Sequence, residues 1–226
     1  MTTRSAVLLG ASGLVGSHLL RLLADDPAYA AIKAFTRRPL GLSGPTVHEV
    51  AVDFDRPEGY RAHLAGVDDV FCCLGTTIKK AGSEDAFRKV DFEAPLAVAR
   101  EARASGAGQF LIVTAVGANA KSRIFYNRVK GEVEEALGKL DFPRGLKVLH
   151  PSMIVGERAE RRPAERIVMG LMRSTRPLFV GGMTRYRAID AIDVARAMHN
   201  AAVQEADNGG VRVYEGESLF SLVRAS

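Results

Sequence analysis

Tryptophan is absent from the 226-residue sequence, and only 7% of the residues are aromatic. The 31 lysines and arginines exceed the 26 aspartates and glutamates, and the net charge of +5 is spread along the chain. A nucleic-acid-binding surface needs basic residues clustered on one face with aromatic residues among them. The composition therefore argues against a nucleic acid as partner, whereas a mildly basic chain suits a phosphorylated ligand.

Cysteine is almost absent. The sequence contains only Cys72 and Cys73, which are adjacent in an apolar run. Adjacent cysteines cannot form a useful structural cross-link, and no second Cys or His cluster lies at the spacing of zinc ligands. We expect no metal site, and two buried thiols in a reducing compartment.

The sequence also lacks a long hydrophobic run and a recognisable leader. No apolar stretch approaches the roughly 18 residues that predict a membrane-spanning helix, and the first residues run directly into an apolar segment. We therefore expect a soluble, cytoplasmic protein with no membrane partner. A hydrophobic content of 47% predicts one globular domain, with a small substrate-side lobe formed mainly by residues 152–226.

What the sequence does contain is a regular alternation of strand-like and helix-like segments. Strands are predicted at residues 5–10, 31–36, 47–52, 70–74, 109–114, 146–150 and 211–214. Helices are predicted at residues 13–25, 57–64, 84–105 with a kink at Pro95, 122–139, 163–173 and 190–205, with a short one at the end. Apolar strands separated by helices predict an α/β fold with a doubly wound parallel sheet, the Rossmann fold.

A glycine-rich turn joins the first strand to the first helix. Its glycines follow an apolar run at three-residue steps, which differs from the commonest dinucleotide motif. Glycines permit a tight turn and a close approach of the backbone, and the helix N-terminus attracts an anion. The pattern predicts a pyrophosphate site, although a turn that binds nothing has the same spacing. We expect cofactor contacts from Gly10, Ser12, Gly13, Leu14, Val15 and Gly16.

Two arginines follow the second predicted strand. Dinucleotide sites that prefer NAD usually place a carboxylate here, on the ribose 2′-hydroxyl, whereas arginine accommodates a 2′-phosphate. Arg37 and Arg38 therefore predict that NADP(H) is preferred and that NAD(H) remains possible. The alternative is a solvated basic turn.

The ends of the third and fourth predicted strands complete the cofactor constellation. Asp53 is placed to accept a hydrogen bond from the adenine amino group, and Phe54 to wall the ring, while Asp55 is equally well explained by a turn. Leu74, Gly75 and Thr76 follow the fourth strand, where a glycine admits the ribose and the pyrophosphate. These features converge on the edge of a sheet where ligands bind in such folds.

The spacing of Tyr126 and Lys130 predicts a catalytic pair. Residues four apart share a face of a helix, so the phenol and the ammonium project together. A free tyrosine is a poor acid–base catalyst at neutral pH, and a nearby ammonium favours the phenolate. Such a pair suits proton transfer to or from a carbonyl or alcohol while hydride moves to or from a nicotinamide.

Together these motifs resemble the short-chain dehydrogenase/reductase superfamily, and within it the atypical group typified by the Tat-interacting-protein oxidoreductase. The resemblance covers about residues 5–165. It rests on Gly10–Gly16, Thr36–Arg38, Cys73–Thr77 with Lys80–Ser83, Val90-Asp91, Phe110–Asn119, Tyr126–Glu132 and Pro151. It implies NADPH binding, with Tyr126 as acid/base and Lys130 on the nicotinamide ribose. By the same match, Ile154 and Arg162 approach the cofactor.

The sequence departs from that family at the end of the fifth strand. Where the family has paired serines, this chain has Thr114-Ala115, and we expect Thr114 to supply the catalytic hydroxyl. If the second position is the catalytic one, the site lacks its hydroxyl, and Ser122 is a possible substitute. His150 stands where relatives tend to have arginine, and we interpret it as a structural, neutral histidine because no carboxylate partner is apparent.

The favoured function is an NADP(H)-dependent oxidoreductase that acts on a small carbonyl or alcohol, as a monomer or homodimer. A rival from another class is an NADP(H)-sensing protein without turnover, since the fold hosts both. A sugar-nucleotide epimerase is a weaker alternative, because the tandem arginines and the short C-terminal part argue against it. The arginines that crowd the C-terminal third are interpreted mostly as a solvated face. They are Arg158, Arg161, Arg162, Arg166, Arg173, Arg176, Arg185 and Arg187.

Overall fold

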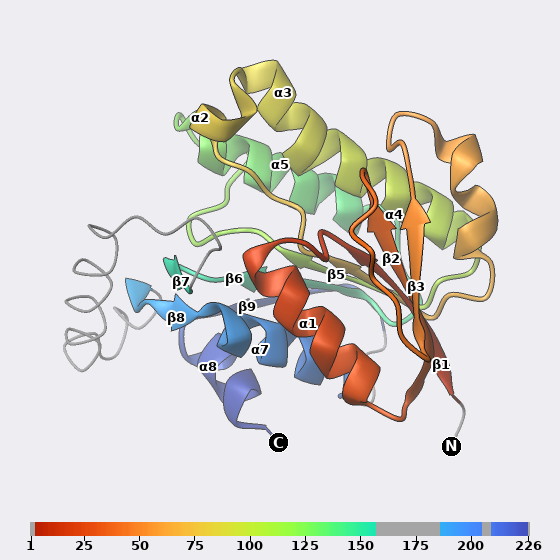
Figure 1. The fold of residues 1–226 in the computed structure, drawn as a ribbon. Coiled ribbons are helices and arrows are strands. Elements are labelled where there is room, and N and C mark those ends of the chain that lie inside the picture. The colour runs from red at the N-terminus through yellow and green to blue at the C-terminus, as the bar shows by residue number, and fades with distance from the viewer. Residues whose placement is uncertain (1–2, 157–185, 205–208, 226) are drawn as a thin grey trace.

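The protein, described here by a computed structural model for residues 3–156, 186–204 and 209–225, is built on one parallel sheet (Figure 1). Its seven strands are hydrogen-bonded in the order β3-β2-β1-β4-β5-β6-β9. They are β1 (Arg4–Leu9), β2 (Tyr29–Thr36), β3 (Val47–Ala51), β4 (Asp69–Cys72), β5 (Gln109–Val113), β6 (Leu146–His150) and β9 (Val211–Glu215). This order confirms the doubly wound Rossmann sheet.

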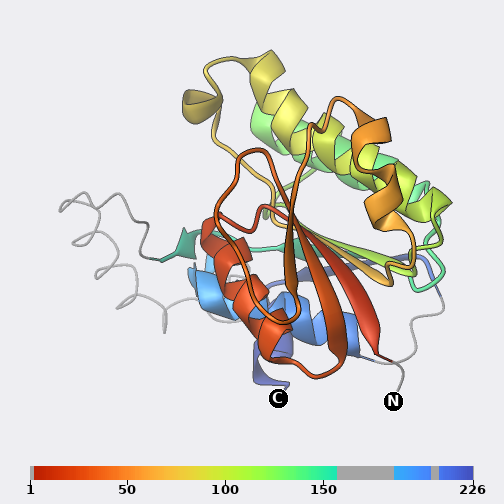
Figure 2. The ribbon, with the colours of Figure 1, turned by 45° about the vertical axis from the view of Figure 1, so that its right-hand side comes forward.

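Helices cover both faces of the sheet, as the turned view in Figure 2 shows. One face carries α1 (Leu14–Asp25) and α7 (Ala191–Val203), with α8 (Glu217–Arg224) against α7. The other carries α4 (Ala94–Ala104) and α5 (Phe125–Gly138). Each layer encloses its own apolar core, because side chains alternate between the two faces of every strand. Burial on both faces explains the near-continuous apolar strands.

The strand order reverses between β1 and β4, and this switch point places the cleft. Leu9, the last residue of β1, lies opposite Cys72, the last residue of β4. The two connections that leave these strands therefore run side by side, at the edge where parallel sheets bind ligands. The glycine turn and the Cys73–Thr77 segment are those connections.

The long helix predicted at 84–105 is divided. It consists of α3 (Glu84–Arg88), a π-helical turn η3 (Lys89–Glu93) and α4, and Pro95 lies in the first turn of α4. Proline lacks an N–H and clashes with the preceding turn, so the chain widens into a π-turn before it. The predicted disturbance is real, but it lies on the N-terminal side of the proline.

The remaining elements are short. Residues 57–64, predicted as one helix, form the 3₁₀ turns η1 (Pro57–Gly59) and η2 (Arg61–Leu64), and α2 (Ile78–Ala81) is a single turn. Strands β7 (Ile154–Val155) and β8 (Ile189–Asp190) pair in parallel outside the main sheet. The helix predicted at 163–173 lies outside the described residues. Within the described ranges, no helix has the length and apolar character to cross a membrane.

Candidate functional site

A cleft of two adjoining cavities lies at the carboxyl end of the sheet. The first, the Arg37 cavity, has a volume of about 780 Å³, and the second, the Tyr126 cavity, has one of about 790 Å³. They share the wall formed by Ser12, Gly13, Cys73, Leu74, Gly75, Thr76 and Lys80. Cavities of this size are typical of small-molecule and cofactor sites.

The glycine turn at the base of the cleft needs its glycines for steric reasons. Gly10 has φ +82°, and a Cβ there would lie 2.6 Å from the Cys73 carbonyl oxygen. A Cβ on Gly16 would lie 2.1 Å from the Gly10 carbonyl oxygen. The turn is closed by a 2.9 Å hydrogen bond from the Gly13 N–H to the Gly10 carbonyl, and α1 begins at the next residue. The backbone thus forms a tight cradle that opens onto a helix N-terminus.

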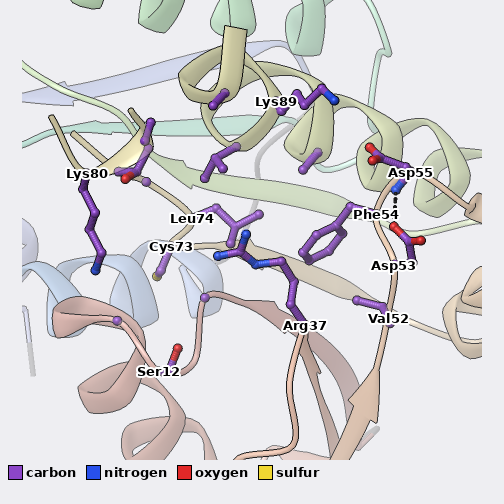
Figure 3. A pocket seen from close by; sticks show the side chains of 18 residues that line it. Ser12, Arg37, Val52, Asp53, Phe54, Asp55, Cys73, Leu74, Lys80 and Lys89 are labelled. Carbon is purple, nitrogen blue, oxygen red and sulfur yellow. Dashed lines mark hydrogen bonds between the residues drawn. The ribbon is translucent and has the colours of Figure 1, made fainter. Parts of the chain in front are cut away.

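The two arginines after β2 differ in their position relative to the cleft. Arg37 lines the Arg37 cavity, and its guanidinium extends into the space between Phe54 and Ser12 (Figure 3). Arg38 is exposed, as Arg37 is, but it lines neither cavity. Lys89 also borders the Arg37 cavity, from the opposite wall. An anion in this cavity would therefore meet Arg37 but not Arg38.

Asp53 and Phe54, which the sequence assigned to the adenine, both line the Arg37 cavity. The Phe54 ring packs edge-on against buried Tyr60, with 6.4 Å between ring centroids. The carboxylate of Asp53 is partly used by its own turn, because it accepts a hydrogen bond from the Asp55 N–H at 3.1 Å. It also lies 3.6 Å from Arg56 Nε. Phe54 thus forms a packed wall of the Arg37 cavity, and the Asp53 carboxylate is held by its own turn at the edge of that cavity.

The Tyr126 cavity brings together the three residues proposed for catalysis. Tyr126 and Lys130 lie one turn apart on α5, and Thr114 follows the end of β5. The Tyr126 ring packs on buried Phe87, with 5.6 Å between ring centroids. The Thr114 hydroxyl is buried and has no hydrogen-bond partner among the described residues. A buried hydroxyl without a partner is costly unless a ligand satisfies it.

The alternative hydroxyl positions lie outside this cavity. Ala115 lines neither cavity, and neither does Ser122. The Ser122 hydroxyl accepts a hydrogen bond from the Ile124 N–H at 3.1 Å and so shapes the turn before α5. Of the hydroxyls that the sequence offered for this role, Thr114 lines the Tyr126 cavity and Ser122 does not.

The contacts implied by the family resemblance are only partly visible. Ile154 on β7 lines the Tyr126 cavity together with Ser152, Leu14 and Val15. Arg162 lies outside the described residues, as do the other arginines between 157 and 185. Ser152 was not singled out from the sequence, and its hydroxyl donates a hydrogen bond to the Arg187 carbonyl at 2.5 Å.

Cys72 and Cys73 are free thiols. Cys72 is buried in β4, and burial raises the pKa of its thiol to about 12. Cys73 is only half-buried, because it follows the strand and lines both cavities, yet burial also raises the pKa of its thiol well above the usual range. Neither thiol is poised as a nucleophile.

His150 differs from its sequence-based interpretation, because it has two carboxylate partners. Its Nε2 lies 2.9 Å from Glu134 of α5, and its Nδ1 lies 3.0 Å from Glu215 of β9. Burial by itself disfavours the charged ring, but Glu134 and Glu215 together outweigh it and raise the pKa of His150. The ring therefore favours the protonated form and joins β6, α5 and β9.

This histidine predicts how stability changes with pH. A pKa raised in the folded state adds stability that is fully present below the unfolded value of about 6.5 and is lost as pH rises through the folded value. We expect His150→Gln to lower the melting temperature most at acidic pH, with a difference from wild type that shrinks as the pH rises above about 6.5. Thermal melts over a pH series measure this. A difference that grows with pH would show that the ring is neutral.

Comparison with known proteins agrees with this geometry. Residues 10–139 match the model of a family described as NAD(P)H-binding, a match that spans the glycine turn, the Arg37 cavity and α5. The chain belongs to this NAD(P)H-binding family. Protein HTATIP2 of Rattus norvegicus is 32% identical over 229 residues, which cover 100% of this chain and 92% of the rat protein. These matches confirm the family resemblance that the motifs indicated.

Two further proteins place this NAD(P)H-binding chain among its relatives. Protein FMP52-1, mitochondrial, of Scheffersomyces stipitis is 29% identical over 229 residues, covering 97% of this chain and 99% of the yeast protein. The structure of MoeE5 in complex with UDP-glucose and NAD has a TM-score of 0.69 at 16% identity. It matches 97% of this chain and 80% of its own, and shows that the two share a fold.

The fungal relatives correct one expectation. FMP52-1 and other fungal relatives carry the word mitochondrial in their names. The expectation of a cytoplasmic protein is therefore wrong. It was drawn from the pattern of the first residues and the paired cysteines, and such patterns say little about the compartment of a folded protein.

The cleft fits the nicotinamide dinucleotide that the family name implies. The glycine cradle lies where two cavities meet, so one extended ligand is able to cross it from Arg37 to Tyr126. The unpartnered Thr114 hydroxyl and the buried Lys130 ammonium supply polar groups at the far end. Such a molecule has a flat ring, phosphate groups and ribose hydroxyls. From the Arg37 cavity to the Tyr126 cavity, the cleft offers the Phe54 wall, then the glycine cradle, then Thr114 and Lys130.

Proposed function

We propose that the protein is an NADP(H)-dependent oxidoreductase of the short-chain type that acts on a small carbonyl or alcohol. One observation carries the proposal: Thr114, Tyr126 and Lys130 converge on a cavity that is continuous with the glycine cradle. A sensing protein needs the cradle but has no need of a phenol, an ammonium and an unsatisfied hydroxyl around one space. The arrangement supports turnover over sensing.

Each of the three residues has a distinct proposed task. Hydride transfer is the chemistry that a nicotinamide supplies when it is bound. Tyr126 would donate the phenol proton to the carbonyl oxygen during reduction and take it back during oxidation. Thr114 would donate a hydrogen bond to the same oxygen, which satisfies its orphaned hydroxyl. Lys130 would hold a ribose hydroxyl and favour the phenolate after proton loss.

The proposed preference for NADP(H) rests on Arg37. Its guanidinium lies inside the Arg37 cavity, beside the aromatic wall of Phe54, where the adenosine end of the cofactor would lie. A planar guanidinium binds a phosphate through two parallel hydrogen bonds. No carboxylate follows β2 at this position to favour a free 2′-hydroxyl.

A direct test is a screen of carbonyl compounds with NADPH, followed by loss of absorbance of the reduced nicotinamide. We expect turnover with a subset of small carbonyl compounds, because the Tyr126 cavity holds the proton-transfer groups Tyr126 and Lys130. Tight NADPH binding without turnover of any compound would contradict the oxidoreductase function and favour a sensing function.

The hydroxyl at the end of β5 gives a sharper test. We expect Thr114→Val to lower turnover by about 10²–10³-fold, the usual cost of one lost hydrogen bond to the reacting oxygen. We expect Ala115→Ser to leave turnover unchanged, because residue 115 does not line the cavity. Steady-state kinetics on a substrate from the screen measures both. Higher turnover in Ala115→Ser, with none lost in Thr114→Val, would move the catalytic hydroxyl to position 115.

A further inference from the structure

The Lys130 ammonium has a buried partner that the sequence analysis did not assign. Lys130 Nζ lies 2.8 Å from Asp91 Oδ1, and the exposed fractions of the two side chains are 4% and 0%. The other carboxylate oxygen, Oδ2, accepts a hydrogen bond from the Thr76 N–H at 3.0 Å. Asp91 therefore holds two walls of the cleft at once: α5 through Lys130, and the connection after β4 through Thr76.

The pair lies at the surface of the cleft itself. Asp91 and Lys130 both line the Tyr126 cavity, and Thr76 lines both cavities. A Cβ on Gly75 would lie 3.6 Å from Asp91 Oδ1 and 3.8 Å from Lys130 Nζ. The glycine therefore places no side chain over the pair, and the largely buried ammonium borders the cavity where a ligand would bind.

The π-turn explains how Asp91 reaches this position. Lys89 and Glu93, two residues away on either side, are exposed, whereas Asp91 is buried. A π-turn adds a residue to a helical turn and so changes the face on which a side chain emerges, and such turns are frequent at functional sites. Here it turns a carboxylate inward, between α5 and the β4 connection.

The carboxylate also determines the charge of Lys130. Burial of an ammonium favours loss of its proton, and the groups that face Lys130 are Asp91, the Tyr126 phenol and the Cys72 thiol. Asp91 is the largest influence that opposes burial, and the net effect raises the pKa of Lys130. An ammonium has three N–H donors, so an ion pair with one carboxylate oxygen leaves donors for a ligand.

We propose that Asp91 is a positioning residue of the cofactor site, which holds Lys130 in place and protonated and fixes the Thr76 segment beside it. This inference rests on the proposed function, because it assumes that the cofactor binds where Lys130 points. It assigns to Asp91 an effect on cofactor binding that passes through Lys130. Loss of Asp91 would leave a buried ammonium without a partner and release one wall of the cleft.

The test is a double-mutant cycle in the full chain, with NADPH binding as the readout. Asp91→Asn keeps an oxygen for the Thr76 N–H and removes the charge, and Lys130→Met removes the ammonium at similar volume. We expect Asp91→Asn to weaken NADPH binding by about tenfold in the wild-type chain and by less than about twofold in Lys130→Met, as for directly coupled residues. Glu93→Gln, exposed on the same π-turn, is the control and should bind as wild type.

Two further readouts separate positioning from a general effect on the fold. Without ligand, the double variant should melt above Asp91→Asn, because it no longer buries a lone charge. In Asp91→Asn, NADPH affinity should weaken with rising pH at a lower pH than in the wild type, because burial without the carboxylate lowers the pKa of the Lys130 ammonium.

Each outcome decides between defined alternatives. An equal loss of affinity in both backgrounds, or no loss in either, overturns the role of Asp91 and leaves the proposed function intact. If the wild-type chain does not bind NADPH, the proposed function fails and this inference fails with it. The unliganded melting cycle then still reports whether Asp91 and Lys130 form the pair.

Discussion

Tyr126→Phe is expected to lower turnover by about 10²–10⁴-fold, the usual contribution of a positioned acid or base. The substitution removes only the phenol oxygen, and the ring keeps its packing on Phe87 at 5.6 Å between centroids. Cofactor affinity should therefore change little. Steady-state kinetics and an NADPH titration on the same preparation measure the two effects separately.

Tyr186→Phe is the matched control for this result. Tyr186 is exposed and does not line either cavity, so its variant should keep wild-type turnover. Near-wild-type turnover of Tyr126→Phe on a confirmed substrate would show that the proton comes from another group. A large loss of NADPH affinity in the same variant would instead give the phenol a binding role.

Arg37→Ala is expected to weaken NADPH binding by about 10–100-fold, since hydrogen bonds to a charged group contribute about 1.5–3 kcal/mol each. NADH binding should change little, because NADH has a free hydroxyl in place of the 2′-phosphate on the adenosine ribose. The selectivity for NADPH over NADH is therefore the quantity that should collapse. Calorimetric titration of wild type and variant with each cofactor measures it.

Arg38→Ala provides an internal control one residue away. Its side chain is exposed and lines neither cavity, so the variant should keep most of the selectivity. From the sequence, both arginines were predicted to bind the 2′-phosphate, whereas in the structure only Arg37 lines the cavity. Equal NADPH and NADH affinities in the wild-type chain would contradict the assignment of a phosphate to this cavity, as would a larger effect of Arg38→Ala than of Arg37→Ala.

The fold was predictable from local patterns. Apolar runs at strand spacing, leucines at helical spacing and three glycines in one turn each depend on a few neighbouring residues. The strand at residues 146–150 was predicted with its observed bounds, and the others within about two residues at either end. The helix at 84–105 was less accurate, because the chain forms the π-turn η3 ahead of Pro95 and so divides the helix.

The candidate site was predictable where its members follow strand ends or share a helix turn. Tyr126 and Lys130 are four residues apart, and Arg37, Asp53 and Leu74 each follow a strand, so the parallel sheet brings them to one edge. Partners from distant segments were not predictable. Asp91 lies 39 residues before Lys130, and Glu215 lies 65 residues after His150.

By itself, the sequence determined that the chain forms a parallel sheet with a glycine cradle at the end of its first strand. That information is local, because backbone conformation and the periodicity of burial are set by neighbouring residues. Only the tertiary structure decided that Arg37 rather than Arg38 faces the cleft, that Lys130 is paired with Asp91, and that His150 lies between two glutamates. These facts depend on which helices and strands pack together, and the charge of each buried group follows from the partners that packing provides.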